Sequence, residues 1–221
     1  MKKVILFLVV LGSFYANYSV QADQREVLIS RDDFDNPNIE TIDWHVTKDA
    51  GANVIAHDDL SYLELMTDTG AQSEGSAVVT GTKGFAVPSS GALVFKSRLH
   101  AYVDSAVYGD GQPRGLVFGS DRSNAIEFVS ATPNSVACRT VRNGKASETV
   151  VPIGQYNSEW AVYQIIATRE RANFYINGKL VASQKKNIPL KALNVYFSTS
   201  DGGAGNVPVV VDYVSFERIL Q

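Results

Sequence analysis

The chain has 221 residues, 45% of them hydrophobic, and its 20 basic and 23 acidic side chains give a net charge of −3. This mildly acidic balance, with no basic tract, argues against nucleic acid as a partner. Cys138 is the only cysteine, so an internal disulfide is excluded, and we expect Cys138 to be a small buried hydrophobic residue.

The first 22 residues have the pattern of a secretory signal peptide. Lys2 and Lys3 precede an apolar run over residues 4–11, and small residues surround a predicted cut after Ala22. The run is too short to cross a bilayer, so we expect no membrane span and a secreted chain, extracellular or periplasmic. Loss of residues 1–22 changes the net charge from −3 to −5, and residues 23–221 fit a single domain.

Short apolar runs separated by turn residues predict strands along the rest of the chain. In chain order they cover residues 54–57, 62–66, 77–80, 91–104, 114–118, 125–130, 160–168, 193–199 and 207–216. The run over residues 91–104 alternates strictly, which is typical of a half-buried strand in an antiparallel sheet. Its polar face carries Lys96, Arg98, His100 and Tyr102.

Two Asn-Gly pairs, at residues 143–144 and 177–178, predict β-hairpins. This dipeptide suits the type I′ turn because both central residues need positive φ. No segment after the signal peptide shows a helical period. The sequence therefore predicts an all-β, two-sheet antiparallel sandwich.

Three segments share features with one superfamily. RDDFDNPNIETIDWHVT (residues 31–47) joins an acidic-Phe turn to a tryptophan strand, SEWAVYQIIATRERANFYINGKLVAS (158–183) joins a Trp-x-x-Tyr strand to a hairpin, and VPVVVDYVSFERI (207–219) forms a closing strand. In this order they resemble the concanavalin A-like superfamily, which includes laminin-G-like lectin domains and glycoside hydrolase family 16. The resemblance implies a jelly-roll sandwich. We expect Trp44, Trp160 and Tyr163 to fill the space between its sheets.

The stretch around Glu127 bears on whether the chain is an enzyme. Glycoside hydrolysis normally needs two carboxyl groups, which family 16 enzymes supply with a Glu-x-Asp-x-x-Glu pattern. On that pattern Glu127 takes the acid/base position, whereas Arg122 stands at the nucleophile and Asn124 at the helper aspartate. Arginine stays protonated, and it stabilises a neighbouring carboxylate rather than the acid form. The catalytic pair is therefore not intact.

Glu127 is also a candidate binding residue. Its neighbours Ile126 and Phe128 are expected to face the core, so Glu127 faces outward and, on a concave face, accepts hydrogen bonds from sugar hydroxyls. We expect Arg139 beside it, with residues 98–102 extending the row. The alternative is that these residues are solvated or paired with one another, in pairs that each contribute little to stability. The candidate ligand-binding residues are Arg98, His100, Tyr102, Glu127 and Arg139.

Calcium is a second candidate ligand. In related domains an ion joins the opening turn to the closing strand, and the resemblance implies Asp33, with Asp32 as an additional ligand, and Asp212 here. Carboxylates from distant segments suit calcium, which takes several oxygen ligands. The alternative is that Asp32 and Asp33 shape a turn and Asp212 faces solvent.

Together these features predict a secreted, non-catalytic, lectin-like domain that binds carbohydrate through its concave sheet face, with a structural calcium as a candidate cofactor. One alternative is a glycoside hydrolase or polysaccharide lyase that uses Arg98, His100 and Tyr102. Another is a structural or adhesive module with a protein partner at the cell surface.

Overall fold

The structure is a computed structural model that describes residues 25–35, 43–49, 51–57, 59–67, 76–101, 115–121, 123–132, 135–153, 160–200 and 209–220. Within these ranges the chain forms strands and turns and no helix, so the all-β prediction is confirmed. The same ranges hold no helix long and apolar enough to cross a membrane. The predicted signal peptide lies outside them and stays a prediction.

The strands pair into two antiparallel sheets. Sheet A has the order β13 (Lys179–Gln184), β12 (Ala172–Ile176), β11 (Ala161–Ala167), β6 (Ala92–Ala101), β15 (Val209–Leu220), β4 (Tyr62–Thr67) and β3 (Ala52–His57), and β1 (Arg25–Asp32) also pairs with β15. Sheet B has the order β10 (Lys145–Pro152), β9 (Ser135–Arg142), β8 (Asn124–Thr132), β7 (Gly115–Asp121), β14 (Leu193–Ser200), β5 (Ser76–Phe85) and β2 (Trp44–Lys48).

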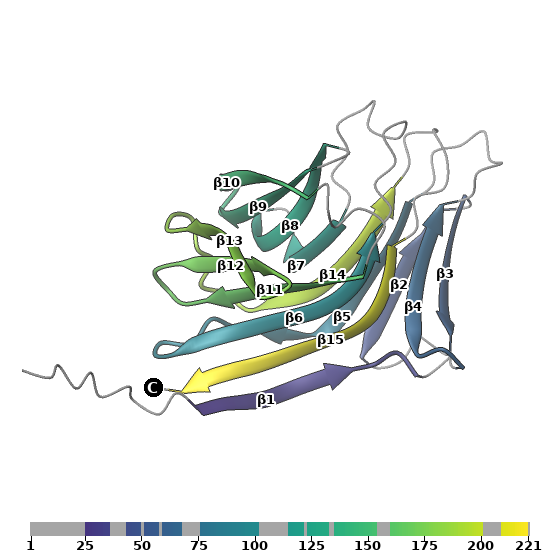
Figure 1. The fold of residues 1–221 in the computed structure, drawn as a ribbon, viewed down its shortest axis with the longest axis horizontal. Coiled ribbons are helices and arrows are strands. Elements are labelled where there is room, and N and C mark those ends of the chain that lie inside the picture. The colour runs from purple at the N-terminus through teal and green to yellow at the C-terminus, as the bar shows by residue number, and fades with distance from the viewer. Residues whose placement is uncertain are drawn as a thin grey trace, which may run out of the picture.

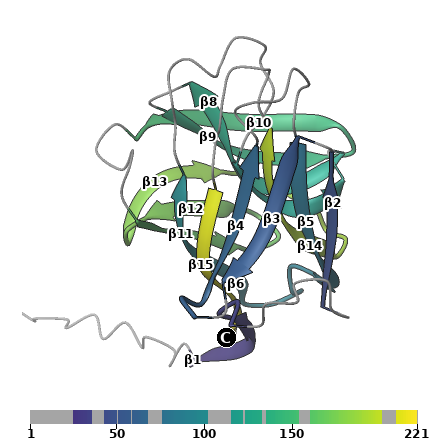
Figure 2. The ribbon, with the colours of Figure 1, turned by 90° about the vertical axis from the view of Figure 1, so that its right-hand side faces the viewer.

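The chain crosses repeatedly between the two sheets, as expected for a jelly roll. Strand β5 belongs to sheet B, β6 to sheet A and β7 again to sheet B. In Figure 1, β1, β15 and β6 run side by side along the lower part of the molecule. In Figure 2, β8, β9 and β10 lie together at the top. The predicted two-sheet antiparallel jelly-roll sandwich is confirmed.

Both predicted hairpins have the expected turn. Asn143 and Gly144 have φ of 51° and 75°, and Asn177 and Gly178 have 49° and 76°. Positive φ at both central residues is the requirement of the type I′ turn. These turns join β9 to β10 in sheet B and β12 to β13 in sheet A.

The hydrophobic core lies between the sheets. Phe128 of sheet B makes edge-to-face contacts with Tyr163 and Phe174 of sheet A, with ring centroids 5.1 and 5.2 Å apart. The Cys138 side chain is fully buried in the same core, as expected. These aromatic pairs add directional contacts to the burial that holds the layers together.

The opening turn is held to the core by Asp32, at the end of β1. Its carboxylate accepts hydrogen bonds from the Phe34 backbone N–H, at 2.8 Å, and from the Trp44 indole N–H, at 2.6 Å. Phe34 has a φ of 53°, which is uncommon for a residue with a side chain. Its ring packs 5.3 Å from that of Trp44, which is 7% exposed, so the core position expected for Trp44 is confirmed.

Candidate functional site

Glu127 and Arg139 form an ion pair on the outer face of sheet B. They stand opposite each other on β8 and β9, and the Arg139 Nε–H donates to the Glu127 carboxylate. Ile126 and Phe128 point into the core, which confirms the predicted orientation of Glu127. The Glu127 side chain is only 4% exposed and that of Arg139 27%. Glu127 is thus not a water-facing strand residue.

The neighbours of the ion pair on this face are buried as well. Four small or medium apolar side chains on β8 and β9 share the outer face with the ion pair and lie outside the core cluster: Ala125, Val129, Ala137 and Val141. Each is at most 6% exposed. The ion pair therefore stands on an apolar floor that is closed to water, where an electrostatic contact is stronger than on an open surface.

Strand register continues this pair into a row across the whole sheet. Residues directly opposite in an antiparallel sheet point to the same face. From Glu127 the register leads through β7, β14, β5 and β2 in one direction and through β9 to β10 in the other. The outer-face row, as we call it, consists of His45, Thr80, Tyr196, Glu127, Arg139 and Glu148, and the backbone of β7 lies between Tyr196 and Glu127.

The row is long and chemically mixed. Seven strands at a spacing of about 4.8 Å give it a length of roughly 29 Å. His45 and Glu148 at its two ends are exposed, and Tyr196 is partly exposed. The row thus offers the His45 imidazole, the Tyr196 ring, the partly exposed Arg139 guanidinium and the Glu148 carboxylate to a ligand that lies across the strands, while the buried Glu127 holds Arg139 in place. The sequence analysis missed His45 and Tyr196, because only the long-range register shows that they align with Glu127, and it missed Glu148, although the predicted turn at residues 143–144 already places Glu148 opposite Arg139.

The remaining positions of the family 16 pattern do not complete a catalytic pair. Arg122 lies outside the described residues. Asn124 is buried at the start of β8, and its side-chain oxygen accepts a hydrogen bond from the Asn143 backbone N–H at 3.4 Å. It therefore supports the neighbouring hairpin. In the row, the side chain next to Glu127 on β9 is the cation Arg139, and the carboxylate of Glu148 follows only one strand further.

Arg98 and His100 do not extend this row, contrary to expectation. Both lie on β6 in sheet A, whereas Glu127 and Arg139 are in sheet B. Arg98 donates to the Asp212 carboxylate at 2.9 Å, and its guanidinium carbon lies 5.0 Å from the centroid of the Trp160 ring system. Parity on a strand predicts which residues share a face, but not which sheet the strand joins. Tyr102 lies outside the described residues.

Trp160 differs from its expected core position. It is 38% exposed, and its ring contacts Arg98 and the buried His100, whose ring centroid is 5.8 Å away. Trp160 immediately precedes β11, whose first residue Ala161 points into the core, so Trp160 turns to the outer side of sheet A. Tyr163, by contrast, occupies the predicted core position.

The residues expected to hold calcium are engaged in other contacts. Asp33 accepts from the Arg31 guanidinium at 2.5 Å, Asp212 accepts from Arg98, and Asp32 holds the opening turn. The described part of the chain contains no group of three or more His, Cys, Asp or Glu side chains that could hold a metal ion. Calcium binding stays a prediction.

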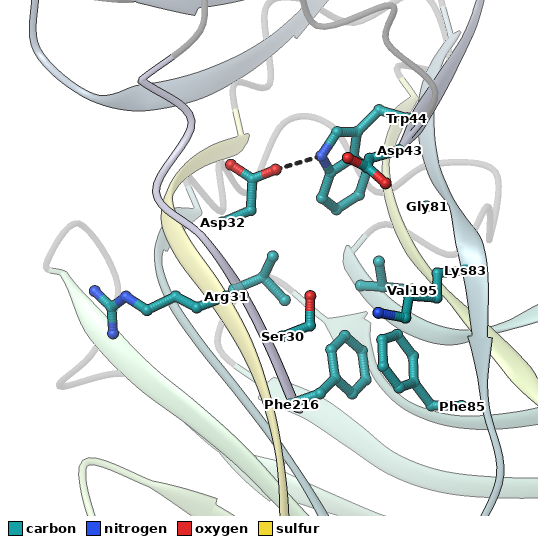
Figure 3. A pocket seen from close by; sticks show the side chains of 11 residues that line it. Ser30, Arg31, Asp32, Asp43, Trp44, Gly81, Lys83, Phe85, Val195 and Phe216 are labelled. Atoms are coloured by element: carbon teal, nitrogen blue, oxygen red, sulfur yellow. Dashed lines mark hydrogen bonds between the residues drawn. The ribbon is translucent and has the colours of Figure 1, made fainter. Parts of the chain in front are cut away.

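A cavity of about 240 Å³ opens between the sheets beside β1 (Figure 3). Asp32, Asp43 and Trp44 line one side, and Phe85 and Phe216 stack at 3.7 Å on another. The Arg31 guanidinium points away from the space. Both Asp32 oxygens already accept hydrogen bonds from Phe34 and Trp44, so this carboxylate serves the fold. The outer-face row therefore remains the stronger candidate site.

Comparison with known proteins identifies the fold. No family model and no curated protein matches the sequence. Among solved structures, the endo-β-1,3-glucanase of Pyrococcus furiosus has a TM-score of 0.68 at 14% identity, over 90% of this chain and 96% of that one. The endo-1,3-β-glucanase of Streptomyces sioyaensis has a TM-score of 0.68 at 16% identity, over 89% of this chain and 97% of that one. The β-glucanase of Bacillus licheniformis has a TM-score of 0.65 at 12% identity, over 87% of this chain and 97% of that one.

The chain has a concanavalin A-like jelly-roll fold. Identities of 12–16% establish this fold alone, because one fold carries many unrelated functions.

Proposed function

We propose that this jelly roll is a secreted, non-catalytic, lectin-like protein that binds an oligosaccharide along the outer-face row of sheet B. The observation that carries the proposal is the alignment of Tyr196, Arg139 and Glu148 in one row, in which the buried Glu127 fixes the position of Arg139. Aromatic rings stack on sugar rings, while carboxylate and guanidinium groups hydrogen-bond hydroxyls. The glucanase names of proteins with this fold support carbohydrate as the ligand class.

The charges of the row favour a neutral glycan. Arg139 stands between Glu127 on β8 and Glu148 on β10, and it is ion-paired with Glu127. Its positive charge is therefore balanced within the row, and a uronate or sulfate would meet two carboxylates. A neutral β-glucan faces no such repulsion.

The same ion pair supports a binding role over hydrolysis. A general acid must carry a proton, whereas an arginine in contact favours the ionised carboxylate. The lyase alternative is also weakened, because Arg98 is already neutralised by Asp212.

Binding is tested by affinity electrophoresis and calorimetry with β-1,3-glucan and mixed-linkage β-1,3-1,4-glucan, and with a polyuronate as the anionic comparison. We expect binding to a neutral glucan that Tyr196→Ala weakens about tenfold, the value of one aromatic contact of about 1.4 kcal/mol. Tyr175→Ala is the matched control, because Tyr175 is also partly exposed but lies on β12 of sheet A. Equal loss in both variants, or no binding to any neutral glycan, would refute the proposal.

Export and the absence of hydrolysis have separate tests. Mass spectrometry of the protein from a secreting host should give a mature N-terminus at Asp23. Incubation with each glucan should release no reducing ends. Sugar release that is lost in Glu127→Gln would replace the lectin proposal with an enzyme.

A further inference from the structure

Strand β1 exposes apolar side chains on both of its faces. Val27, Leu28 and Ile29 are 39%, 58% and 37% exposed, and Leu220, on the neighbouring β15, is 44% exposed. Among the described strands β1 pairs only with β15, so its other edge is free of strand partners, as the lower border of Figure 1 shows. An exposed apolar edge strand is a template for pairing with another chain.

The sequence of β1, REVLISRD, is complementary to itself when read in the opposite direction. In an antiparallel pair of two copies centred between Leu28 and Ile29, Arg25 stands opposite Asp32 and Glu26 opposite Arg31. Both outer pairs join opposite charges, and the centre of the pair is apolar. Cross-strand pairs of opposite charge stabilise a sheet, and like charges destabilise it.

The β-bulge of β1 makes this register possible. Opposite residues must share a face, but Arg25 and Asp32 are seven positions apart and would lie on different faces of a regular strand. The bulge between Leu28 and Ser30 inserts one residue, so the β15 partners of Arg25 and Asp32 are Leu220 and Val214, an even number of positions apart. The partners of Glu26 and Arg31, Ile219 and Ser215, also share a face.

The charged side chains are already held at this edge by contacts within the chain. Glu26 accepts from the Lys96 ammonium at 3.0 Å, and Arg31 donates to Asp33 at 2.5 Å and lies over the Tyr213 ring at 4.3 Å. Because these contacts already order the two side chains, less side-chain entropy is lost when a partner binds. We propose that the chain forms a homodimer in which β1 of each copy pairs antiparallel with β1 of the other, joining the two copies of sheet A into one continuous sheet.

The interface is small, so the dimer should be weak. One strand pair with a few apolar side chains lies below the standard interface size, and we expect a dissociation constant on the order of 10 µM. Sedimentation velocity over roughly 1–200 µM should show the average mass rising from one chain toward two. A monomer throughout this range would overturn the proposal.

One substitution tests the apolar centre. Leu28→Lys places two positive charges at the two-fold axis, and we expect it to abolish dimerisation while circular dichroism and the melting transition still report a folded monomer. The matched control is Leu180→Lys, which changes a 53% exposed leucine on β13, the opposite edge of sheet A, and should leave the dimer intact. If Leu28→Lys still dimerises, or if Leu180→Lys dissociates equally, the assignment to β1 is wrong.

Charge reversal tests the register, and the melting transition of each variant is measured as well, because Glu26 also contacts Lys96 and Arg31 also contacts Asp33 within the chain. Glu26→Arg and Arg31→Glu should each weaken the dimer at least tenfold, because each places like charges opposite one another. The double variant carries a reversed but complementary pair, so it should recover to within about threefold of the original affinity. A double variant as weak as the single ones would refute this register.

Discussion

Removal of Arg139 should destabilise this jelly roll far more than loss of a surface ion pair would. Exposed pairs contribute roughly 0.2–1 kcal/mol, whereas removing one partner of a buried pair costs roughly 3–5 kcal/mol. The Glu127 side chain is 4% exposed and that of Arg139 27%, so water reaches one partner only. We therefore expect Arg139→Ala to lower the free energy of unfolding by about 3 kcal/mol, near the lower end of the buried range.

A second substitution separates the buried charge from the lost packing of the arginine. Glu127→Gln removes the charge with little change of shape, so Arg139→Ala combined with Glu127→Gln should be more stable than Arg139→Ala alone, by roughly 1–2 kcal/mol. Glu148→Gln, at the exposed end of the same row, should stay within about 0.5 kcal/mol of the wild type.

The measurement is equilibrium urea unfolding, with fluorescence and circular dichroism compared to check for a single transition. A loss of about 3 kcal/mol corresponds to a fall of roughly 6–12 °C in melting temperature for a domain of this size. A loss below about 0.5 kcal/mol for Arg139→Ala, or a double variant less stable than the single one, would show that Glu127 does not depend on its arginine.

Burial raises the pKa of the Cys138 thiol to about 12, so a thiol reagent near pH 8 should modify Cys138 only when urea unfolds the protein. Labelling of the native protein as fast as that of the unfolded protein would contradict this. Gly91→Ala should lower the free energy of unfolding by more than about 2 kcal/mol, because φ is +76° and the added Cβ would lie 2.0 Å from a carbonyl oxygen of β15. Gly144→Ala is the control, because its φ of +75° is similar but the space around it is open, and it should lower the free energy of unfolding by about 1 kcal/mol. Burial, together with its hydrogen bond to Glu26, raises the pKa of Glu217, so the stability from Glu217 is present below its ordinary pKa of 4.5 and lost as the pH rises through the raised value. The stability advantage of the wild type over Glu217→Gln, followed by melting temperature, should therefore shrink as the pH is raised above the ordinary pKa of 4.5, and a growing advantage would reverse the assignment.

Local patterns in the sequence predict local structure well here. The Asn-Gly pairs specify their turns because positive φ at Asn143 and Asn177 is a property of the dipeptide itself. Strict alternation predicts β6, and the apolar neighbours of Glu127 predict its face. The contact with Arg139 also follows from local sequence, because one short connection joins β8 to β9.

Strand β1 shows why some elements escape such patterns. Its residues are mostly exposed on both faces, so no period of two separates core from solvent, and its bulge interrupts the register with β15. The strand exists because β15 supplies hydrogen-bond partners more than 180 positions along the chain. Nothing within REVLISRD marks that partner, although the same eight letters contain the charge pattern on which the dimer proposal rests.

The half of the outer-face row that contains Tyr196, Thr80 and His45 depends on long-range register. Tyr196 and Glu127 belong to strands that are not neighbours in the chain, and β7 lies between them because it pairs with β14 on one edge and with β8 on the other. On its own strand each residue of the row is an ordinary outward side chain. If any one pairing shifted by one residue, the side chain that this strand contributes to the row would point into the core instead. The proposed site is therefore specified by the same apolar pattern that builds the core, since every core residue that fixes a register also fixes where Tyr196, Glu127 and Arg139 stand.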